Sequence, residues 1–218
     1  REDDLISIIA YIKHILIIRK LNLKKNYTDF LPFNKIKVRL KKEIVSLGKG
    51  EINLDKYKGT SIKPSQWDKL IMREDIKVID TRNTYEIDIG RFKNSINPYT
   101  NSFREFPAKF KKSGIQKNDK LAIYCTGGIR CEKAAAYLKS NGFNSIYQLE
   151  GGILNYLSYK KENNSSSLWT GDCFVFDQRV SVNTQLKSGE HIQCFGCRQP
   201  LNKEDIKSDK YKKGISCP

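Results

Sequence analysis

Residues 120–130, Lys-Leu-Ala-Ile-Tyr-Cys-Thr-Gly-Gly-Ile-Arg, decide the fold class of this 218-residue chain. The run from Leu121 to Tyr124 predicts a buried strand, and a helix is expected from Arg130 onward. Cys125 lies in the glycine-containing turn between these two elements. Because open parallel sheets bind their ligands at the carboxyl ends of their strands, we predict that Cys125 belongs to a reactive loop.

The chemistry of this loop follows from its backbone. Successive N–H groups of a glycine-rich turn converge with the positive end of the following helix, and together they form an anion nest that lowers the pKa of a thiol. The expected nest comprises Thr126, Gly127, Gly128 and Ile129. The two glycines permit the positive φ angles that a nest requires. We therefore predict a nucleophilic thiolate at Cys125.

Two side chains beside the nest have candidate roles. Arg130 is expected either to brace the loop or to pair with a bound anion. Cys131 is close enough in sequence to resolve a sulfenate or persulfide on Cys125, and simple packing is the alternative role.

Helices and strands alternate on both sides of the loop. The expected helices cover residues 65–73, 102–112 and 130–141 and begin again after residue 152, and the expected strands cover 77–80, 120–124 and 145–149. This pattern predicts an α/β fold, in which a largely parallel sheet is covered by helices on both faces. A polar linker over 162–167 marks the C-terminal limit of this domain. We therefore assign the domain to residues 61–162.

The flanking segments are shorter. Residues 1–60 contain an amphipathic apolar stretch over 5–16 and an alternating stretch over 35–41, which predicts a strand with one basic face. We interpret this segment as part of a small α+β domain. Residues 163–218 form a short cysteine-containing extension.

Two upstream stretches give the fold a more specific identity. Residues 79–86, Ile-Asp-Thr-Arg-Asn-Thr-Tyr-Glu, and 90–97, Gly-Arg-Phe-Lys-Asn-Ser-Ile-Asn, resemble the first signature of rhodanese domains. The related dual-specificity phosphatases have one more residue between Cys and Arg, which makes room for a phosphate. Here four residues separate Cys125 from Arg130, which suits a sulfur atom or a persulfide better than a phosphoester.

Other stretches resemble one bacterial group of rhodanese-containing proteins, the tRNA uridine hydroxylases, which use molecular oxygen to make 5-hydroxyuridine at the wobble position. The similar stretches are residues 32–34, 38–45, 79–83, 103–107, 124–133, 150–154 and 173–182. The resemblance implies that a ferredoxin-like α+β domain, only part of which is in this sequence, precedes the rhodanese domain. It also implies that Cys125 is the active cysteine, that tRNA is the partner and that oxygen is the co-substrate.

Two alternatives to hydroxylation stay open. One is a sulfurtransferase that carries a persulfide on Cys125, and the other is an inactive truncated member of the group. The Gly-x-Gly-x-x-Gly fingerprint is missing from the sequence, so no bound organic cofactor is indicated. A facial-triad iron site is not expected either, because the only histidines, His14 and His191, are remote in sequence.

The cysteines of the extension suggest a metal. Cys194-x-x-Cys197 followed by Cys217 resembles the first three ligands of a four-cysteine zinc site. Cys173 as a substitute ligand, or inert thiols without metal, are the alternatives.

A formal net charge of +16 favours a polyanionic partner, with a solvated lysine-rich surface as the alternative. The candidate RNA-binding residues are Lys37, Arg39, Lys41 and Lys42. Six cysteines without a secretory signal indicate a reducing compartment, and we expect a soluble cytoplasmic protein. Arg82 and Arg104 are expected to brace the fold through carboxylates such as Asp80 or Glu86.

Overall fold

The computed structural model describes residues 2–18, 30–35 and 38–218. It contains two compact units, Arg1–Asn34 and Lys35–Pro218. In the first unit, helix α1 (Glu2–Leu16) has acidic residues in its first turn and Lys13 and His14 in its last turn, which suits the helix dipole. The amphipathic stretch over 5–16 is therefore helical. None of the described helices is long and apolar enough to cross a bilayer.

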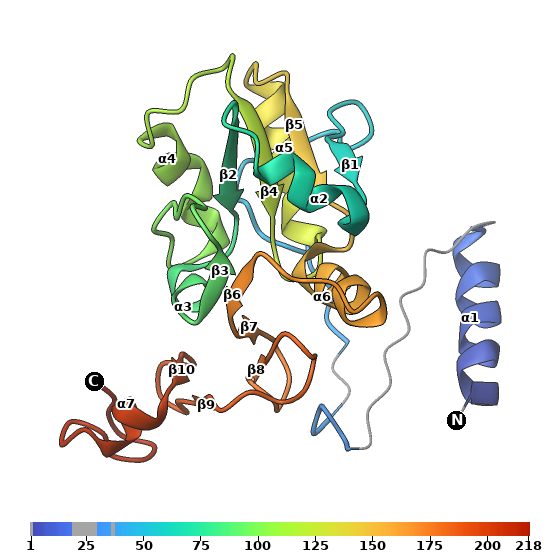
Figure 1. Cartoon of the computed structure of the whole chain (residues 1–218). Coiled ribbons are helices and arrows are strands. Elements are labelled where there is room, and N and C mark those ends of the chain that lie inside the picture. Colours follow the sequence, from blue (N-terminus) through green and yellow to red (C-terminus); the bar gives the residue numbers. More distant parts are fainter. Residues whose placement is uncertain (1, 19–29, 36–37) are drawn as a thin grey trace. The chain divides into compact units, whose positions relative to one another are not determined.

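The second unit is built on a four-stranded parallel sheet (Figure 1). Its strand order is β1-β5-β4-β2, and the strands are β1 (Thr60–Ile62), β2 (Ile76–Asp80), β4 (Lys120–Tyr124) and β5 (Ile146–Leu149). Strand β4 pairs with β2 on one side and with β5 on the other. The predicted parallel α/β fold is confirmed, although the short edge strand β1 was not foreseen.

Helices cover both faces of this sheet. Side chains of a strand alternate between faces, and β4 follows this rule. Leu121 and Ile123 pack into one core with residues of α4 (Phe106–Lys111) and α5 (Ile129–Ser140). Ala122 and Tyr124 pack into a second core with residues of α2 (Pro64–Ile71) and α6 (Gly152–Glu162). Residues 121–124 of β4 thus contribute side chains to both cores.

The remaining elements are short. They are the 3₁₀ turn η1 (Phe103–Glu105), helices α3 (Thr84–Asp88) and α7 (Lys203–Lys207), and strands β3 (Gly90–Phe92), β6 (Trp169–Gly171), β7 (Cys173–Phe174), β8 (Ser181–Val182), β9 (Ile192–Gln193) and β10 (Pro200–Leu201). Antiparallel pairing of β3 with β6 joins the C-terminal extension to the body of the unit. The extension lies at the carboxyl edge of the parallel sheet (Figure 1).

The strand expected over residues 35–41 is wrong for the part that the structure describes. Residues 38–41 are irregular, and the side chains of Val38 and Leu40 are fully or almost fully exposed. A strand must share its backbone hydrogen bonds with a neighbour, and no described segment pairs with this one. The period-two alternation therefore had no partner strand to stabilise it.

The two-core arrangement predicts how core and exposed truncations differ. Ile123 is 0% exposed, so Ile123→Ala should lower the free energy of unfolding by about 2–5 kcal/mol in urea titrations. Val38→Ala is the control, since Val38 is 91% exposed, and it should change stability by less than about 0.5 kcal/mol. Equal losses for both variants would contradict the assignment of β4 to the core.

Candidate active site

Cys125 follows β4 directly and is 2% exposed. The backbone N–H of Gly128 donates a hydrogen bond to Cys125 Sγ at 3.1 Å. Gly128 has φ +94°, so the left-handed conformation expected of the loop is present at this residue. Gly127, by contrast, does not adopt a positive φ, which corrects the expectation for that glycine. A single left-handed residue is enough to turn the loop backbone toward the sulfur.

The N-terminus of α6 holds the other side of the loop. The carbonyl oxygens of Cys125 and Thr126 accept hydrogen bonds from the N–H groups of Ile153 and Leu154, at 2.9 and 3.2 Å. Gly152 makes this close approach feasible, because a Cβ there would lie 2.5 Å from the carbonyl oxygen of Cys125. Gly127 and Ile129 are exposed, so the loop is open to solvent on that side.

The thiol of Cys125 is acidic. A hydrogen bond from the Cys131 side chain lowers its pKa to about 6, helped by the charge of Arg130 and by the N–H groups of Cys131 and Gly128, while burial opposes the shift. The Gly128 and Cys131 amides thus supply the anion nest. At neutral pH Cys125 is therefore mostly a thiolate.

Cys131 has the opposite behaviour. Burial raises its pKa well above the ordinary value, and the hydrogen bond and charge of the neighbouring Cys125 raise it further. The thiol therefore stays protonated and donates to the Cys125 thiolate. Cys131 Sγ also lies 3.6 Å from Thr81 Oγ1. The structure thus brings the candidate resolving thiol into direct contact with the nucleophile.

Arg130 is held by a buried carboxylate. Its Nη1 and Nη2 donate to the two carboxylate oxygens of Glu86 at 2.6 and 2.7 Å, and Glu86 is 0% exposed. Nη2 also lies 3.5 Å from Thr126 Oγ1. Of the two expected roles, these contacts favour bracing of the loop, because the guanidinium is already paired. Its charge still stabilises the Cys125 thiolate.

A second buried pair lies beside the first. Arg82 makes a bidentate contact with Asp80 and donates to the carbonyl oxygens of Glu86 and Gly90. Arg82 therefore braces the fold as expected, whereas Arg104 is exposed. Glu86 was expected to serve Arg82 or Arg104, and its actual partner is Arg130. The sequence signal for Glu86 was its place at the end of residues 79–86, the first of the two stretches that resemble the rhodanese signature.

Side chains of the extension complete the site. The Phe176 ring lies 5.8 Å from Arg130 Cζ and is 64% exposed. Phe174 packs edge-on against Tyr85, with ring centroids 5.3 Å apart. No local sequence pattern predicted that aromatic rings would lie here. One exposed aromatic ring, that of Phe176, therefore lies beside the reactive loop, while Phe174 is buried.

The candidate RNA-binding residues that the structure describes are exposed, but they do not form a strand. Lys37 lies outside the described residues, while Arg39, Lys41 and Lys42 are exposed in an irregular stretch rather than on a strand face. Glu43, the next residue, pairs with Lys133 of α5 at 3.2 Å, and Lys133 also donates to the Val45 carbonyl oxygen. This anchor holds the basic stretch beside the helix that begins at the reactive loop.

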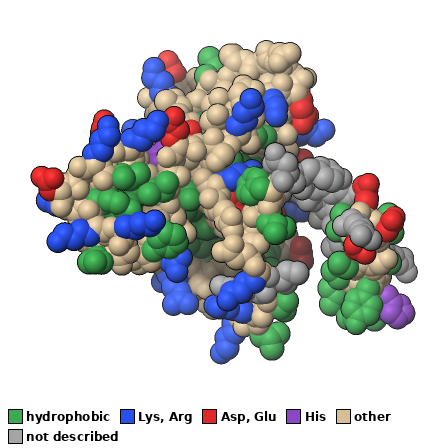
Figure 2. Space-filling view, turned by 90° about the horizontal axis from the view of Figure 1, so that it is seen from below, with side chains coloured by type: hydrophobic (Ala, Val, Ile, Leu, Met, Phe, Trp, Pro, Cys, Tyr) green, Lys and Arg blue, Asp and Glu red, His purple; other side chains and the backbone are tan. Residues whose placement is uncertain are grey.

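The basic side chains that Figure 2 shows are dispersed, whereas three of the cysteines expected to bind a metal lie together. Lys and Arg side chains are spread over one face of the molecule among acidic and apolar ones (Figure 2). Cys194, Cys197 and Cys217 come together, whereas Cys173 lies fully buried in the second core, where burial raises its pKa to about 12. Cys173 is therefore not a substitute metal ligand.

The hydrogen bond from Cys131 generates a test of the acidic thiol. The rate at which iodoacetamide alkylates Cys125 should rise with pH to a midpoint near pH 6 and should fall away in more acidic solution. In Cys131→Ala the midpoint should move up toward the ordinary thiol value of about 8.5, because the largest stabilising contact is lost. Mass spectrometry of the Cys125 peptide measures both rates. An unchanged midpoint in the variant would contradict the role of Cys131.

The Glu86–Arg130 pair generates a stability test. Glu86→Ala leaves a buried guanidinium without a counter-charge and should cost about 3–5 kcal/mol in urea unfolding. The control is Glu190→Ala, which removes the partner of Lys203 in an exposed pair and should leave the unfolding midpoint nearly unchanged, because water already solvates both charges. If the two losses are the same, Glu86 does not anchor the loop.

One family model matches the part of the chain that holds the reactive loop. Residues 63–159 match the family model of the rhodanese-like domain. A rhodanese-related protein from Thermoplasma volcanium is 28% identical, with coverage of 46% of this chain and 92% of that chain and a TM-score of 0.38. A rhodanese-like domain protein from Staphylococcus aureus is 26% identical, with coverage of 44% and 90% and a TM-score of 0.38. The polysulfide-sulfur transferase from Wolinella succinogenes is 25% identical, with coverage of 49% and 80% and a TM-score of 0.41. The family match and the loop that follows β4 lead to one conclusion: residues 63–159 form a rhodanese-like domain.

Proposed function

We propose that this protein hydroxylates the wobble uridine of tRNA at C5 with molecular oxygen, and that Cys125 is its reactive group. The observation that carries the proposal is the exposed ring of Phe176 beside Arg130 in the reactive loop. Exposed aromatic side chains are the usual platforms on which proteins stack unpaired RNA bases. A thiolate and a stacking surface are therefore neighbours in one site.

The resemblance to tRNA uridine hydroxylases supports the same proposal. It includes residues 38–45 and 173–182, which lie outside the rhodanese-like domain. In the structure, the first of these stretches is anchored to α5 through the Glu43–Lys133 pair, and the second supplies Phe174 and Phe176. The exposed basic residues of the first stretch suit contacts with RNA phosphates.

The proposed chemistry begins with addition of the thiolate to the uracil ring. Cys125 Sγ forms a bond to C6, and the electron pair of the C5–C6 double bond moves to C5, where the C4 carbonyl group stabilises it. The electron-rich C5 then takes one oxygen atom from molecular oxygen. An external two-electron donor reduces the second oxygen atom to water. Loss of the C5 proton and departure of Cys125 restore the double bond.

A second candidate function is sulfur transfer, and the contacts of Cys125 Sγ favour it. The Gly128 N–H that points at this sulfur would equally stabilise a persulfide anion. The Cys125 thiolate would attack the sulfane sulfur of a donor and form a new S–S bond. The donor's own bond to that sulfur would break, and the rest of the donor would leave with the electron pair. A thiolate or cyanide acceptor would then take the outer sulfur and release the Cys125 thiolate.

Mass spectrometry of tRNA nucleosides tests the first candidate. In cells without this gene, 5-hydroxyuridine and its derivatives should be lost, and wild-type protein should restore them whereas Cys125→Ser should not. Phe176→Ala should weaken restoration about tenfold, since a stacked base contributes about 1–3 kcal/mol. Phe195→Ala, which truncates a comparably exposed ring, is the control and should restore fully.

Two results would contradict hydroxylation. One is an unchanged level of 5-hydroxyuridine in cells that lack the gene, and the other is full restoration by Cys125→Ser. A thiosulfate:cyanide assay on the purified protein separates the second candidate. Turnover that depends on Cys125, together with unchanged tRNA, would assign the protein to sulfur transfer.

A further inference from the structure

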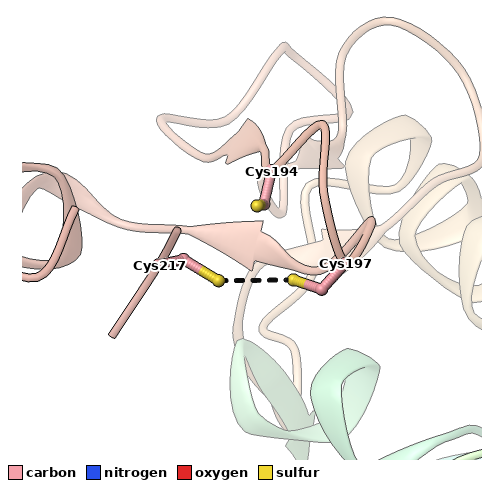
Figure 3. Close-up of side chains that lie close together, drawn as sticks. All are labelled: Cys194, Cys197 and Cys217. Atoms are coloured by element: carbon pink, nitrogen blue, oxygen red, sulfur yellow. Dashed lines mark hydrogen bonds between the residues drawn. The ribbon is translucent and has the colours of Figure 1, made fainter. Parts of the chain in front are cut away.

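The three cysteines of the C-terminal segment converge although the last is distant in sequence from the other two. The Sγ atoms of Cys194, Cys197 and Cys217 all lie within 4.8 Å of one another. Cys197 Sγ and Cys217 Sγ are 3.4 Å apart, and the Cys194 side chain points toward this pair (Figure 3). Among the described residues, this is the one group of three or more side chains that could hold a metal ion.

Tight turns fix these positions. Cys194 and Cys197 occupy the turn between β9 and β10, which is closed by hydrogen bonds from Cys194 N–H to the Gln199 carbonyl and from Arg198 N–H to the Cys194 carbonyl, both at 2.9 Å. Cys217 follows a second turn, in which Lys212 and Ser216 exchange two backbone hydrogen bonds of 2.9 Å. The backbone N–H groups of Gly196 and Cys197 are directed at Cys194 Sγ.

The spacing suits a metal better than a disulfide. A tetrahedral zinc ion with Zn–S bonds of about 2.3 Å holds its sulfur atoms about 3.8 Å apart. The 3.4 Å between Cys197 Sγ and Cys217 Sγ and the 4.8 Å limit on all three sulfur–sulfur distances bracket that value. A disulfide needs its two sulfur atoms about 2.0 Å apart and would leave the third cysteine of the cluster unused.

The surrounding segment lacks a core of its own. Between residues 192 and 218 only Cys194 and Leu201 are buried. The regular structure there is one pair of two-residue strands and a five-residue helix. A polypeptide of this size cannot bury enough apolar surface to fold stably, and small segments of this kind commonly depend on disulfides or metals.

We propose that Cys194, Cys197 and Cys217 bind one zinc ion, and that this ion stabilises the fold of residues 192–218. Each thiol releases its proton as it coordinates, so three thiolates balance the ion and leave one negative charge on the site. Water or another ligand takes the fourth position of the tetrahedron. The site is independent of the reactive loop and of the function proposed for it.

Metal analysis of the purified 218-residue protein tests this proposal. Inductively coupled plasma mass spectrometry should find one zinc ion per chain in the wild-type protein and less than about a tenth of that in Cys197→Ser and Cys217→Ser. Cys125→Ser makes the same chemical change in the reactive loop and should keep the full zinc content. A chelator should speed hydrogen exchange in residues 192–217 but leave β4 unchanged.

Cobalt substitution gives a readout that does not depend on variants that fold poorly. Cobalt(II) added to the metal-free, reduced protein should produce the thiolate-to-metal charge-transfer band and the visible bands of a tetrahedral site. Three results would overturn the proposal. The first is a protein that binds neither zinc nor cobalt. The second is a protein that contains iron or copper instead of zinc. The third is a disulfide between Cys197 and Cys217 in protein purified under reducing conditions.

Discussion

The bidentate ion pair between Glu86 and Arg130 is the contact on which the reactive loop depends. It joins α3, which follows β2, to the first turn of α5, which follows β4. Both charges are shielded from water, so each needs the other, and loss of one partner would leave an uncompensated buried charge. The pair fixes the direction in which α5 leaves the sheet. That direction determines where Gly128 and Cys131 present their donors to Cys125.

Ionisation of the buried Cys125 thiol follows from this geometry. Burial alone would raise the pKa of the thiol, and the donors and the charge of Arg130 outweigh it. Cys131 remains neutral beside it, so the two thiols share one negative charge rather than two. Cys125 is therefore a deprotonated nucleophile at neutral pH.

Much of the fold follows from the sequence pattern, because buried parallel strands and the helices between them have strong periodic signals. Strand β4, helix α5 and the position of Cys125 between them were predictable in this way. The short strands β1, β3 and β6 were not, since three residues carry no period and are fixed by their partners. The alternation over residues 35–41 predicted a strand wrongly, because a periodic pattern forms a strand only beside a partner and no described strand pairs with this stretch.

The residues of the site also differ in whether the sequence predicts their positions. The loop and its cysteine are local in sequence, so the expected strand, turn and helix around Cys125 and the signature over residues 79–86 and 90–97 predicted them. The approach of Phe176 to Arg130 joins residues that are far apart in the chain, and no local pattern could predict it. The convergence of Cys217 on the Cys194–Cys197 turn is equally distant in sequence, but the preference of metals for cysteines at short spacing gave a signal.

The proposed hydroxylation depends on attack of the Cys125 thiolate on uridine in RNA. The most direct measurement uses an anticodon stem-loop RNA with 5-fluorouridine at the wobble position, because fluorine at C5 replaces the hydrogen whose loss would release the enzyme. Mass spectrometry of the digested protein should then find the RNA attached to the Cys125 peptide, and the adduct should be missing from Cys125→Ser. Absence of any adduct from wild-type protein that nevertheless hydroxylates ordinary RNA would contradict the account.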